Sequence, residues 1–377
     1  MDLTLSPSET AFRDEVRSWL RAQSPGPPPP VAEERFDFML RWQRTLHDAG
    51  YAGISWPREH GGRGATLMEQ AIFNEEIVRA GAPQPANVIG LVMGGPVVIT
   101  HGTAEQQARF LAPILSGDEI WCQGFSEPNA GSDLASLSAR AERVDGGWRV
   151  HGQKVWTSYA HRAAWCMLLA RTSDDARYRN LTYFICAMQQ DEVEVRPLRQ
   201  ATGDSEFNEV FFNGAFIPDD NVVGDVGGGW KVAITTLMFE RAGLAAGSAL
   251  SIQLELAGLA ELIRARGRSQ DGVLRRRFAE LVVETETLRL NGYRQLSRVI
   301  SDGVPGPEGS IGKIQWADIN QRAGELALDV LGSDALRDDP VWTRRALRAR
   351  GNSIEGGTSE IQRNILAERV LGLPRLR

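Results

Sequence analysis

Residues 125–133 read FSEPNAGSD, and they mark the point at which the chain changes from helical to β-type patterning. Before this stretch, apolar residues recur mainly at helical spacing. After it, short β-type runs alternate with turns, and long amphipathic helical patterns return from about residue 227. The sequence therefore predicts three domains: a helical domain over residues 1–120, a β domain over 121–225 and a second helical domain over 226–377.

The composition is that of a folded globular protein. The chain has 377 residues, of which 42% are hydrophobic and 24% are charged. Lys and Arg number 42 against 48 Asp and Glu, which gives a net charge of −6. This mildly acidic balance argues against nucleic acid as a partner, because phosphate binding needs a clustered basic face.

The cysteines and the apolar runs indicate a cytoplasmic protein. Cys122, Cys166 and Cys186 are an odd number, lie far apart and form no CxxC pair, so we interpret them as buried thiols rather than disulfides or a metal site. The polar, acidic N-terminus does not resemble a signal peptide. The longest apolar runs fall well short of the ~20 residues that cross a bilayer, so we expect no membrane span.

The FSEPNAGSD loop carries two hydroxyl groups, on Ser126 and Ser132, among residues that turn the backbone sharply. Such a loop can hold a polar heterocycle or a phosphate, because hydroxyls and free amides gather in it. Taken alone, it is better explained as a capped surface turn.

Residues 154–158 read KVWTS and end a β-type run. Trp156 followed by Thr157 and Ser158 would give an aromatic cofactor a stacking wall with hydrogen-bond donors. Taken alone, a tryptophan in a strand is more often part of the core.

Residues 356–363 read GGTSEIQR. Gly356 and Gly357 permit close approach of the backbone to a ligand, and Ser359 and Gln362 have the spacing of a capping box. A helix start preceded by glycines is a good seat for an anion. A helix start that is merely well capped would show the same pattern.

Together, the three motifs and the domain order resemble the acyl-CoA dehydrogenase family over essentially the whole chain. The resemblance implies an α+β multidomain fold with an N-terminal helical domain, a middle β-barrel domain and a C-terminal four-helix bundle. It also implies an FAD enzyme that oxidises an acyl-CoA to its trans-2-enoyl-CoA. Such an enzyme would assemble as a tetramer and pass electrons to an electron-transfer flavoprotein.

The resemblance also assigns residues to the cofactor. Ser126 would bond the pyrimidine side of the flavin, and Trp156 would stack beside the ring with Ser158 facing N5. Thr358 and Gln362 would hold the pyrophosphate and adenosine portion. The full set of implied FAD contacts is Phe125, Ser126, Gly131, Ser132, Trp156, Thr157, Ser158, Arg268, Gly357, Thr358 and Gln362.

The implied reaction needs a carboxylate beside the acyl Cα. Many family members carry this glutamate where the present chain has Gly356. In the isovaleryl and long-chain branches it is instead a Glu before an Arg on the first long C-terminal helix, and Glu240 and Arg241 match that pattern. Glu240 is therefore the predicted base, with a helix–helix ion pair as its alternative role. Glu355 lies one residue too early and would face another direction.

Three further roles follow from the same resemblance. The backbone N–H of Gly356 would polarise the thioester carbonyl, which makes it part of the catalytic set. Ser132 and Arg241 are assigned to the CoA side of the site.

Two departures from the family pattern affect the FAD contacts between subunits. The usual Arg-x-x-Phe-Gly appears as Arg268-Ser269-Gln270-Asp271-Gly272, and the usual Gln-x-x-Gly-Gly turn appears as residues 329–333, DVLGS. Both a homotetramer and a heterotetramer with a related subunit, of the steroid side-chain type, therefore stay open. Oxidase or monooxygenase chemistry on the same scaffold is a further alternative.

Overall fold

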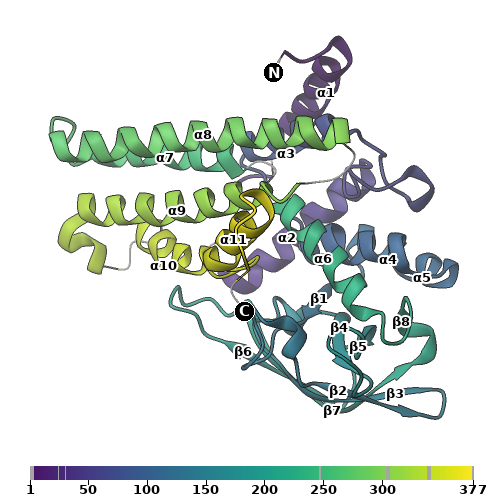
Figure 1. The fold of residues 1–377 in the computed structure, drawn as a ribbon. Coiled ribbons are helices and arrows are strands. Elements are labelled where there is room, and N and C mark those ends of the chain that lie inside the picture. Colours follow the sequence, from purple (N-terminus) through teal and green to yellow (C-terminus); the bar gives the residue numbers. More distant parts are fainter. Residues whose placement is uncertain are drawn as a thin grey trace. The chain divides into compact units, whose positions relative to one another are not determined.

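The computed structural model describes residues 4–23, 25–29, 31–245, 248–302, 306–337 and 341–375 (Figure 1). The chain forms two compact units. Unit 1 comprises Met1–Ser24, Thr66–Ala82 and Arg241–Arg377, and unit 2 comprises Pro25–Ala65 and Pro83–Glu240. The division falls within helix α6 (Gly229–Ala245), directly after Glu240. Within these described ranges, no helix is long and apolar enough to cross a membrane.

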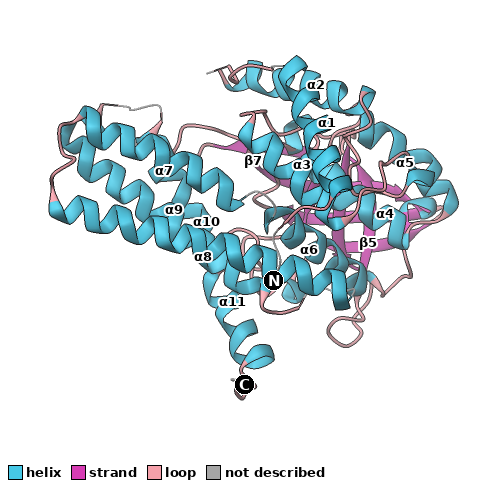
Figure 2. Cartoon of the chain, turned by 90° about the horizontal axis from the view of Figure 1, so that it is seen from above, coloured by secondary structure: helices cyan, strands magenta, loops and turns pink. Residues whose placement is uncertain are grey.

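Unit 2 is built on one eight-stranded sheet, whose strands are magenta in Figure 2. The strand order is β6-β7-β3-β2-β4-β5-β8, and β1 pairs with β4. The β-type patterning that begins near residue 121 therefore forms a single sheet. The strands are β1 Trp121–Gly124, β2 Arg140–Val144, β3 Gly147–Lys154, β4 Trp165–Arg171, β5 Leu181–Ala187, β6 Val193–Leu198, β7 Phe207–Pro218 and β8 Val222–Val223.

The sheet bends back on itself without closing into a barrel. Trp148 in β3 meets Phe184 in β5 edge to face, with ring centroids 5.7 Å apart, although these strands are not neighbours in the sheet. The buried cluster around both rings includes the free thiols of Cys122, Cys166 and Cys186. Among the described strands no pairing joins β6 to β8, so the structure shows a curled, open sheet and the predicted barrel is not confirmed.

Helices cover the other face of this sheet. Helices α4 (Gly95–His101), α5 (Ala104–Ser116) and α6 share a buried cluster with β4 and β5, in which Phe110 and Val232 meet Met167 and Tyr183. Helix α2 (Ala32–Asp48) packs on α5. Because α6 carries Glu240, this packing ties the predicted base to the sheet of unit 2.

The close fit of α6 on the sheet depends on Gly229. A Cβ at this position would lie 2.5 Å from the carbonyl carbon of Thr182 and 2.6 Å from the amide nitrogen of Tyr183, both in the backbone of β5. Gly229→Ala should therefore shift α6 and lower the free energy of unfolding by about 1–3 kcal/mol, which denaturant titration measures. Gly272→Ala is the control, because Gly272 also begins a helix but has open space around its Cβ position. Equal losses in the two variants would contradict this account.

Unit 1 consists of helices. They are α1 Pro7–Gln23, α3 Leu67–Arg79, α7 Ser248–Ala265, α8 Gly272–Asp302, α9 Gly309–Leu331, α10 Trp342–Asn352 and α11 Ser359–Ile365. A buried cluster unites α7, α8, α9 and α10 through Leu259, Leu281, Leu326 and Trp342. The helical nature of the C-terminal region is thus confirmed. The predicted four-helix bundle is not confirmed in its details, because α6 up to Glu240 belongs to unit 2.

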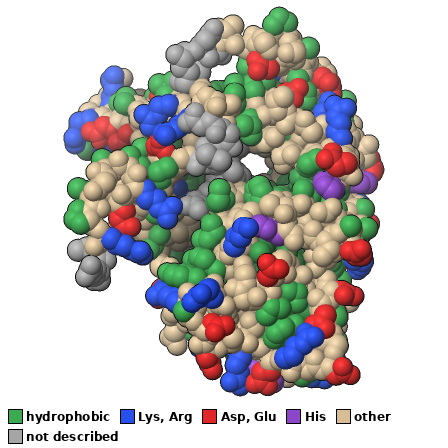
Figure 3. Space-filling view, turned by 45° about the vertical axis from the view of Figure 1, so that its right-hand side comes forward, with side chains coloured by type: hydrophobic (Ala, Val, Ile, Leu, Met, Phe, Trp, Pro, Cys, Tyr) green, Lys and Arg blue, Asp and Glu red, His purple; other side chains and the backbone are tan. Residues whose placement is uncertain are grey.

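Surface charges of both signs are mixed. On the face drawn in Figure 3, basic and acidic side chains are interspersed rather than gathered by sign. Pairs such as Arg322 with Glu284, at 2.6 Å, account for part of this pattern. The near balance of 42 basic and 48 acidic residues is therefore spread along the surface as local pairs.

Candidate active site

The first two motifs lie side by side in unit 2. The amide N–H of Val155 donates to the carbonyl of Ser126 over 2.9 Å, and Lys154 Nζ donates to the carbonyl of Phe125 over 3.0 Å. These bonds join the FSEPNAGSD loop to the end of β3, directly before Trp156. The two motifs that the sequence assigns to one cofactor are therefore neighbours in the fold.

A buried ion pair stabilises the junction between the FSEPNAGSD loop and the end of β3. Lys154 Nζ lies 2.9 Å from Glu127 Oε1, and both side chains are almost wholly buried. The amide and hydroxyl of Ser138 and the amide of Ala139 also donate to Glu127, at 2.7, 2.6 and 2.8 Å. Burial alone would raise the pKa of Glu127, but Lys154 and Ser138 outweigh it and hold that pKa below its usual range. Burial also lowers the pKa of Lys154, although Glu127 opposes the shift.

Trp156 is exposed, and its backbone is strained. The residue is 60% exposed and has a φ of 62°, a left-handed conformation that costs a non-glycine residue on the order of 1–3 kcal/mol. Its ring meets Phe207 nearly edge-on, with centroids 6.1 Å apart. Strain of this kind gathers at functional sites, and an exposed indole suits stacking of an aromatic ring.

Asn208 holds the peptide that follows Trp156. Buried in β7, it donates from Nδ2 to the carbonyl of Thr157 over 2.8 Å, and its own carbonyl accepts from the Thr157 amide at 3.0 Å. Thr157 Oγ1 is buried and has no hydrogen-bond partner within the described structure. Ser158 is half-buried, and neither its N–H nor its hydroxyl bonds to any group of the described ranges. The Ser158 hydroxyl thus stays available to a ligand, whereas the Thr157 hydroxyl is enclosed by the chain.

The other predicted residues of the loop differ in accessibility. Phe125 is buried and packs edge-on against Tyr183 with centroids 5.8 Å apart, so its side chain belongs to the core. Ser126 is half-buried, whereas Gly131 and Ser132 are exposed. A Cβ at Gly131 would meet nothing within 4 Å, so the chain itself leaves this position open to a ligand.

Glu240 is half-buried and continues the face of α6 that packs on the sheet. Thr236, one turn earlier, is buried with its hydroxyl 3.2 Å from the Tyr183 hydroxyl in β5. Residues four apart share a helix face. Because Tyr183 also packs on Phe125, a continuous path of contacts leads from the FSEPNAGSD loop to the turn before Glu240. The side chain of the neighbouring Arg241 lies outside the described part of the structure.

The third motif lies in unit 1 as a glycine turn that leads into α11. Gly356 and Gly357 have φ values of 63° and 88°, which favour glycine. Thr358 caps the helix, because its Oγ1 accepts from the Ile361 amide at 3.2 Å. The capping box predicted from Ser359 and Gln362 is therefore wrong, since Thr358 is the N-cap and the third helical residue, Ile361, has no polar side chain to complete a box.

Gln362 is buried, and its amide is used inside unit 1. Its Nε2 donates to the carbonyl of Gly356 over 3.1 Å, and its Oε1 accepts from the Ser310 hydroxyl at 2.7 Å. A Cβ at Gly357 would lie 2.5 Å from the same Nε2, so the turn and the side chain fit each other closely. Gln362 thus shapes the glycine turn, and its contact with a cofactor stays a prediction.

Glu355 is held by two neighbours. Arg348 pairs with its carboxylate at 2.7 Å, and Asn352 Nδ2 donates to it over 2.6 Å. A carboxylate engaged in this way is poorly placed to accept a substrate proton. Glu355 is thus engaged within unit 1, and the choice of Glu240 as the base stays a prediction.

Arg268, predicted to meet FAD across a subunit boundary, is engaged at the α7–α8 turn. It donates to Asp271 Oδ2 and to the Asp329 carbonyl, each over 2.8 Å. Asp271 also caps α8, because its Oδ1 accepts from the amides of Val273 and Leu274. Asp271, which stands where the family pattern has phenylalanine, therefore caps α8 and forms an ion pair with Arg268.

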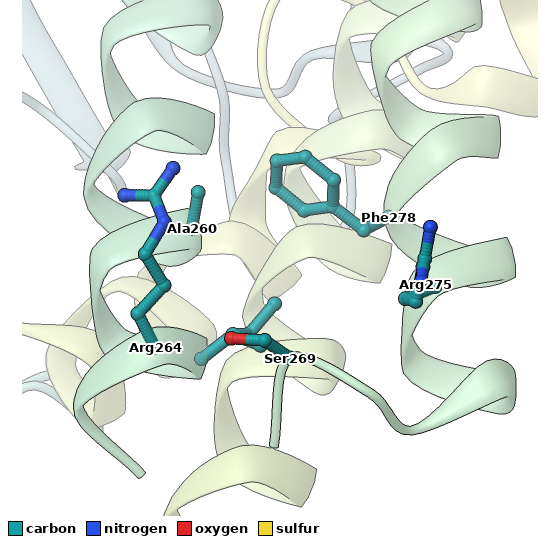
Figure 4. Close-up of a pocket in the computed structure, with 6 residues that line it drawn as sticks. Ala260, Arg264, Ser269, Arg275 and Phe278 are labelled. Atoms are coloured by element: carbon teal, nitrogen blue, oxygen red, sulfur yellow. The ribbon is translucent and has the colours of Figure 1, made fainter. Parts of the chain in front are cut away.

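A small pocket of about 130 Å³ lies beside this turn (Figure 4). Figure 4 shows Arg264 on one helix and Arg275 with Phe278 on the next, with Ser269 on the connection between them. The lining residues are Ala260, Ile263, Arg264, Ser269, Arg275 and Phe278. None of the predicted site residues lines it.

Motif reading missed three residues that build the site. Lys154, Glu127 and Asn208 are charged or polar, yet they are buried and hold the backbone of the two motifs. One signal was present in β3, where Trp148 and Val150 face inward and Lys154 follows at the same alternation. A lysine at an inward strand position requires a buried counter-charge, which points to an acidic partner nearby.

Three family models match the chain, in the order of the predicted domains. They are "Acyl-CoA dehydrogenase, N-terminal domain" over residues 6–118, "Acyl-CoA dehydrogenase, middle domain" over 122–215, and "Acyl-CoA dehydrogenase, C-terminal domain" over 227–371. Together they cover most of the sequence.

The chain is also similar to curated proteins that carry acyl-CoA dehydrogenase names, and to solved structures. The chain is 41% identical to acyl-CoA dehydrogenase IpdE1 of Mycolicibacterium smegmatis and 40% identical to IpdE1 of Mycobacterium tuberculosis, with 97% of each chain covered in both cases. Among solved structures, the Tcur3481-Tcur3483 steroid ACAD matches with a TM-score of 0.88 and 27% identity, over all of both chains. The ChsE4-ChsE5 complex from Mycobacterium tuberculosis matches with a TM-score of 0.84 and 26% identity, again over all of both chains.

Proposed function

Because this chain belongs to the acyl-CoA dehydrogenase family, we propose that it oxidises an acyl-CoA between the α and β carbons to the trans-2-enoyl-CoA. The observation that carries this proposal is the junction in unit 2. There the Ser126 loop is bonded to the strand end that presents the exposed, strained Trp156. A strained backbone that exposes an aromatic side chain to solvent is expected where a flat cofactor binds.

FAD, on which enzymes of this family depend, supplies the two-electron acceptor that no side chain offers. The residues of unit 2 fit such a group. Trp156 offers an exposed indole, and Ser126 and Ser158 have hydroxyls that bond to no described group. The contact that we propose for Thr157 is through its backbone, because its hydroxyl is enclosed by the chain. Phe125, Gly131 and Ser132 would complete this contact surface. Arg268, Gly357, Thr358 and Gln362 are the contacts we propose from unit 1.

Glu240 is the proposed catalytic base. It would accept the proton from the substrate Cα, and its half-buried position on the packed face of α6 reduces the hydration of the carboxylate. Glu355 is the weaker candidate, because it lies one residue before the position that the family pattern uses.

Two further groups would act on the thioester. The Gly356 N–H donates to no group in the described ranges and would polarise the thioester carbonyl, which makes the α proton more acidic. Ser132, exposed at the end of its loop, and Arg241 are the residues we propose for contact with the CoA arm.

We also propose that three domains meet near residues 120 and 225. The matched ranges of the three family models, which break between 118 and 122 and between 215 and 227, support these boundaries.

The electron acceptor that we propose is an electron-transfer flavoprotein, as the resemblance implies.

A second candidate is a heteromeric enzyme for steroid-like acyl-CoA substrates, with this chain as one of two related subunits in a tetramer. The similar structures named as Tcur3481-Tcur3483 steroid ACAD and ChsE4-ChsE5 complex are each named for two chains. Arg268 is tied to Asp271 and Asp329 in unit 1, which favours a chain that does not provide a neighbour's FAD contact. An unlike partner would then provide what this chain lacks.

Purification and anaerobic titration test the proposal. The protein should be yellow and should bleach when an acyl-CoA is added, and a panel of straight, branched and steroid-like acyl groups would identify the preferred class. A colourless protein that gains FAD only with a co-expressed relative would favour the heteromeric candidate. Peroxide release during turnover without an added acceptor would instead indicate an oxidase. A yellow protein that no acyl-CoA bleaches would contradict dehydrogenase activity.

A further inference from the structure

The buried pair of Lys154 and Glu127 controls the direction of one peptide group. The carbonyl of Phe125 accepts from Lys154 Nζ at 3.0 Å, so it points into the core. A peptide group is planar, and in its trans form the C=O and N–H point to opposite sides. The N–H of Ser126, which belongs to the same peptide as the Phe125 carbonyl, is therefore turned away from Lys154.

Ser126 is left with two groups for a ligand. Within the described ranges, neither its N–H nor its hydroxyl bonds to another group of the chain, whereas its carbonyl is used by the Val155 amide at 2.9 Å. Both groups are also next to the chain segment that carries Trp156. An unpaired N–H and a hydroxyl on one half-buried residue form a pair of donors suited to the acceptor atoms of a heterocycle.

Several hydrogen bonds hold the Lys154–Glu127 pair in place. Lys154 is fully buried, and Glu127 accepts four hydrogen bonds, from Lys154 Nζ, the Ser138 amide and hydroxyl, and the Ala139 amide. Replacing both members of a buried ion pair by neutral side chains is often neutral for stability, whereas removing one leaves an uncompensated charge. Stability alone therefore gives no strong reason for a lysine at this inward strand position.

We propose that Lys154 and Glu127 are positioning residues, which hold the Ser126 N–H as a donor for the flavin ring, next to the Ser126 hydroxyl. This inference rests on the proposed function, because it takes FAD as the ligand of the junction. It assigns no chemistry to the pair. Its effect is to fix the direction of donors before the ligand arrives, so that no reorientation of the loop opposes binding.

The test separates donor direction from folding. Lys154→Met alone should unfold at a lower temperature, because Glu127 is left buried without its counter-charge. The double variant Lys154→Met with Glu127→Gln should recover most of the apoprotein melting temperature. It should nevertheless bind FAD about tenfold more weakly in titrations of apoprotein, and show a shifted flavin absorption spectrum.

An exposed pair in the same unit is the matched control. Arg143 and Asp219 form an ion pair at the surface of the sheet, and Arg143→Met with Asp219→Asn should leave FAD affinity and the flavin spectrum unchanged. A double variant of Lys154 and Glu127 with wild-type affinity and spectrum would overturn the inference. A wild-type protein that binds no FAD, either alone or with a co-expressed relative, would instead contradict the proposed function, so the two failures are distinguishable.

Discussion

Replacement of Glu240 by Gln should slow flavin reduction by acyl-CoA by a factor of roughly 10² to 10⁴, the usual contribution of a positioned base. Glutamine keeps the size of the side chain, but its amide cannot accept the α proton. Substrate binding should change little, because Ser132 and Arg241 are the residues proposed to hold the CoA arm. Anaerobic stopped-flow absorbance measures the reduction step, and the spectral change on binding an unreactive acyl-CoA analogue measures affinity.

Glu355→Gln is the matched control for this experiment. Glu355 has the same chemistry and lies next to Gly356, but it is held by Arg348 and Asn352. Its replacement should leave the rate of flavin reduction within a few fold of wild type and should mainly affect the turn before α11. If Glu240→Gln reduced flavin at a near-normal rate while Glu355→Gln did not, the base would be Glu355 and our assignment would be wrong.

Two tryptophans should respond in opposite ways to replacement by alanine. Trp56 is 2% exposed, its Nε1 donates to the Leu91 carbonyl over 2.9 Å, and a Cβ at Gly95 would fall 1.9 Å from its ring. Trp56→Ala should therefore lower the free energy of unfolding by about 3–5 kcal/mol, because it leaves a large cavity in unit 2. Denaturant titration of the apoprotein measures this loss.

Trp156→Ala should leave the stability of the apoprotein nearly unchanged. The side chain is exposed, so little buried area is lost, while alanine tolerates the left-handed backbone no better than tryptophan. FAD affinity should fall by about tenfold, because a stacking partner is worth about 1–3 kcal/mol. Normal FAD binding by Trp156→Ala, or a loss of stability like that of Trp56→Ala, would contradict the role of Trp156 as a cofactor wall.

Much of the architecture could be predicted from local patterns. Helical spacing, the change of patterning near residue 121 and the return of amphipathic helices identified helical, β and helical regions, which the family models match in the same order. Closure of the sheet could not be predicted in this way, because pairing between β6 and β8 depends on how far the whole sheet curls. The cap of α11 was misassigned for a related reason: Gln362 reaches Ser310, 52 residues earlier in the chain.

The three motifs, and the prediction that Glu240 rather than a residue at position 356 is the base, come from the sequence because each depends on a short run of adjacent residues. Their support is not readable there. Lys154 meets Glu127 and Phe125, and Asn208 meets Thr157, only because β3 is paired with β7 and lies against the loop that follows β1. Burial makes these few polar contacts specific, since a buried charge or amide must find its partner or destabilise the fold. The sequence thus predicts which groups take part in the proposed chemistry, whereas the contacts that orient them depend on packing between segments far apart in the chain.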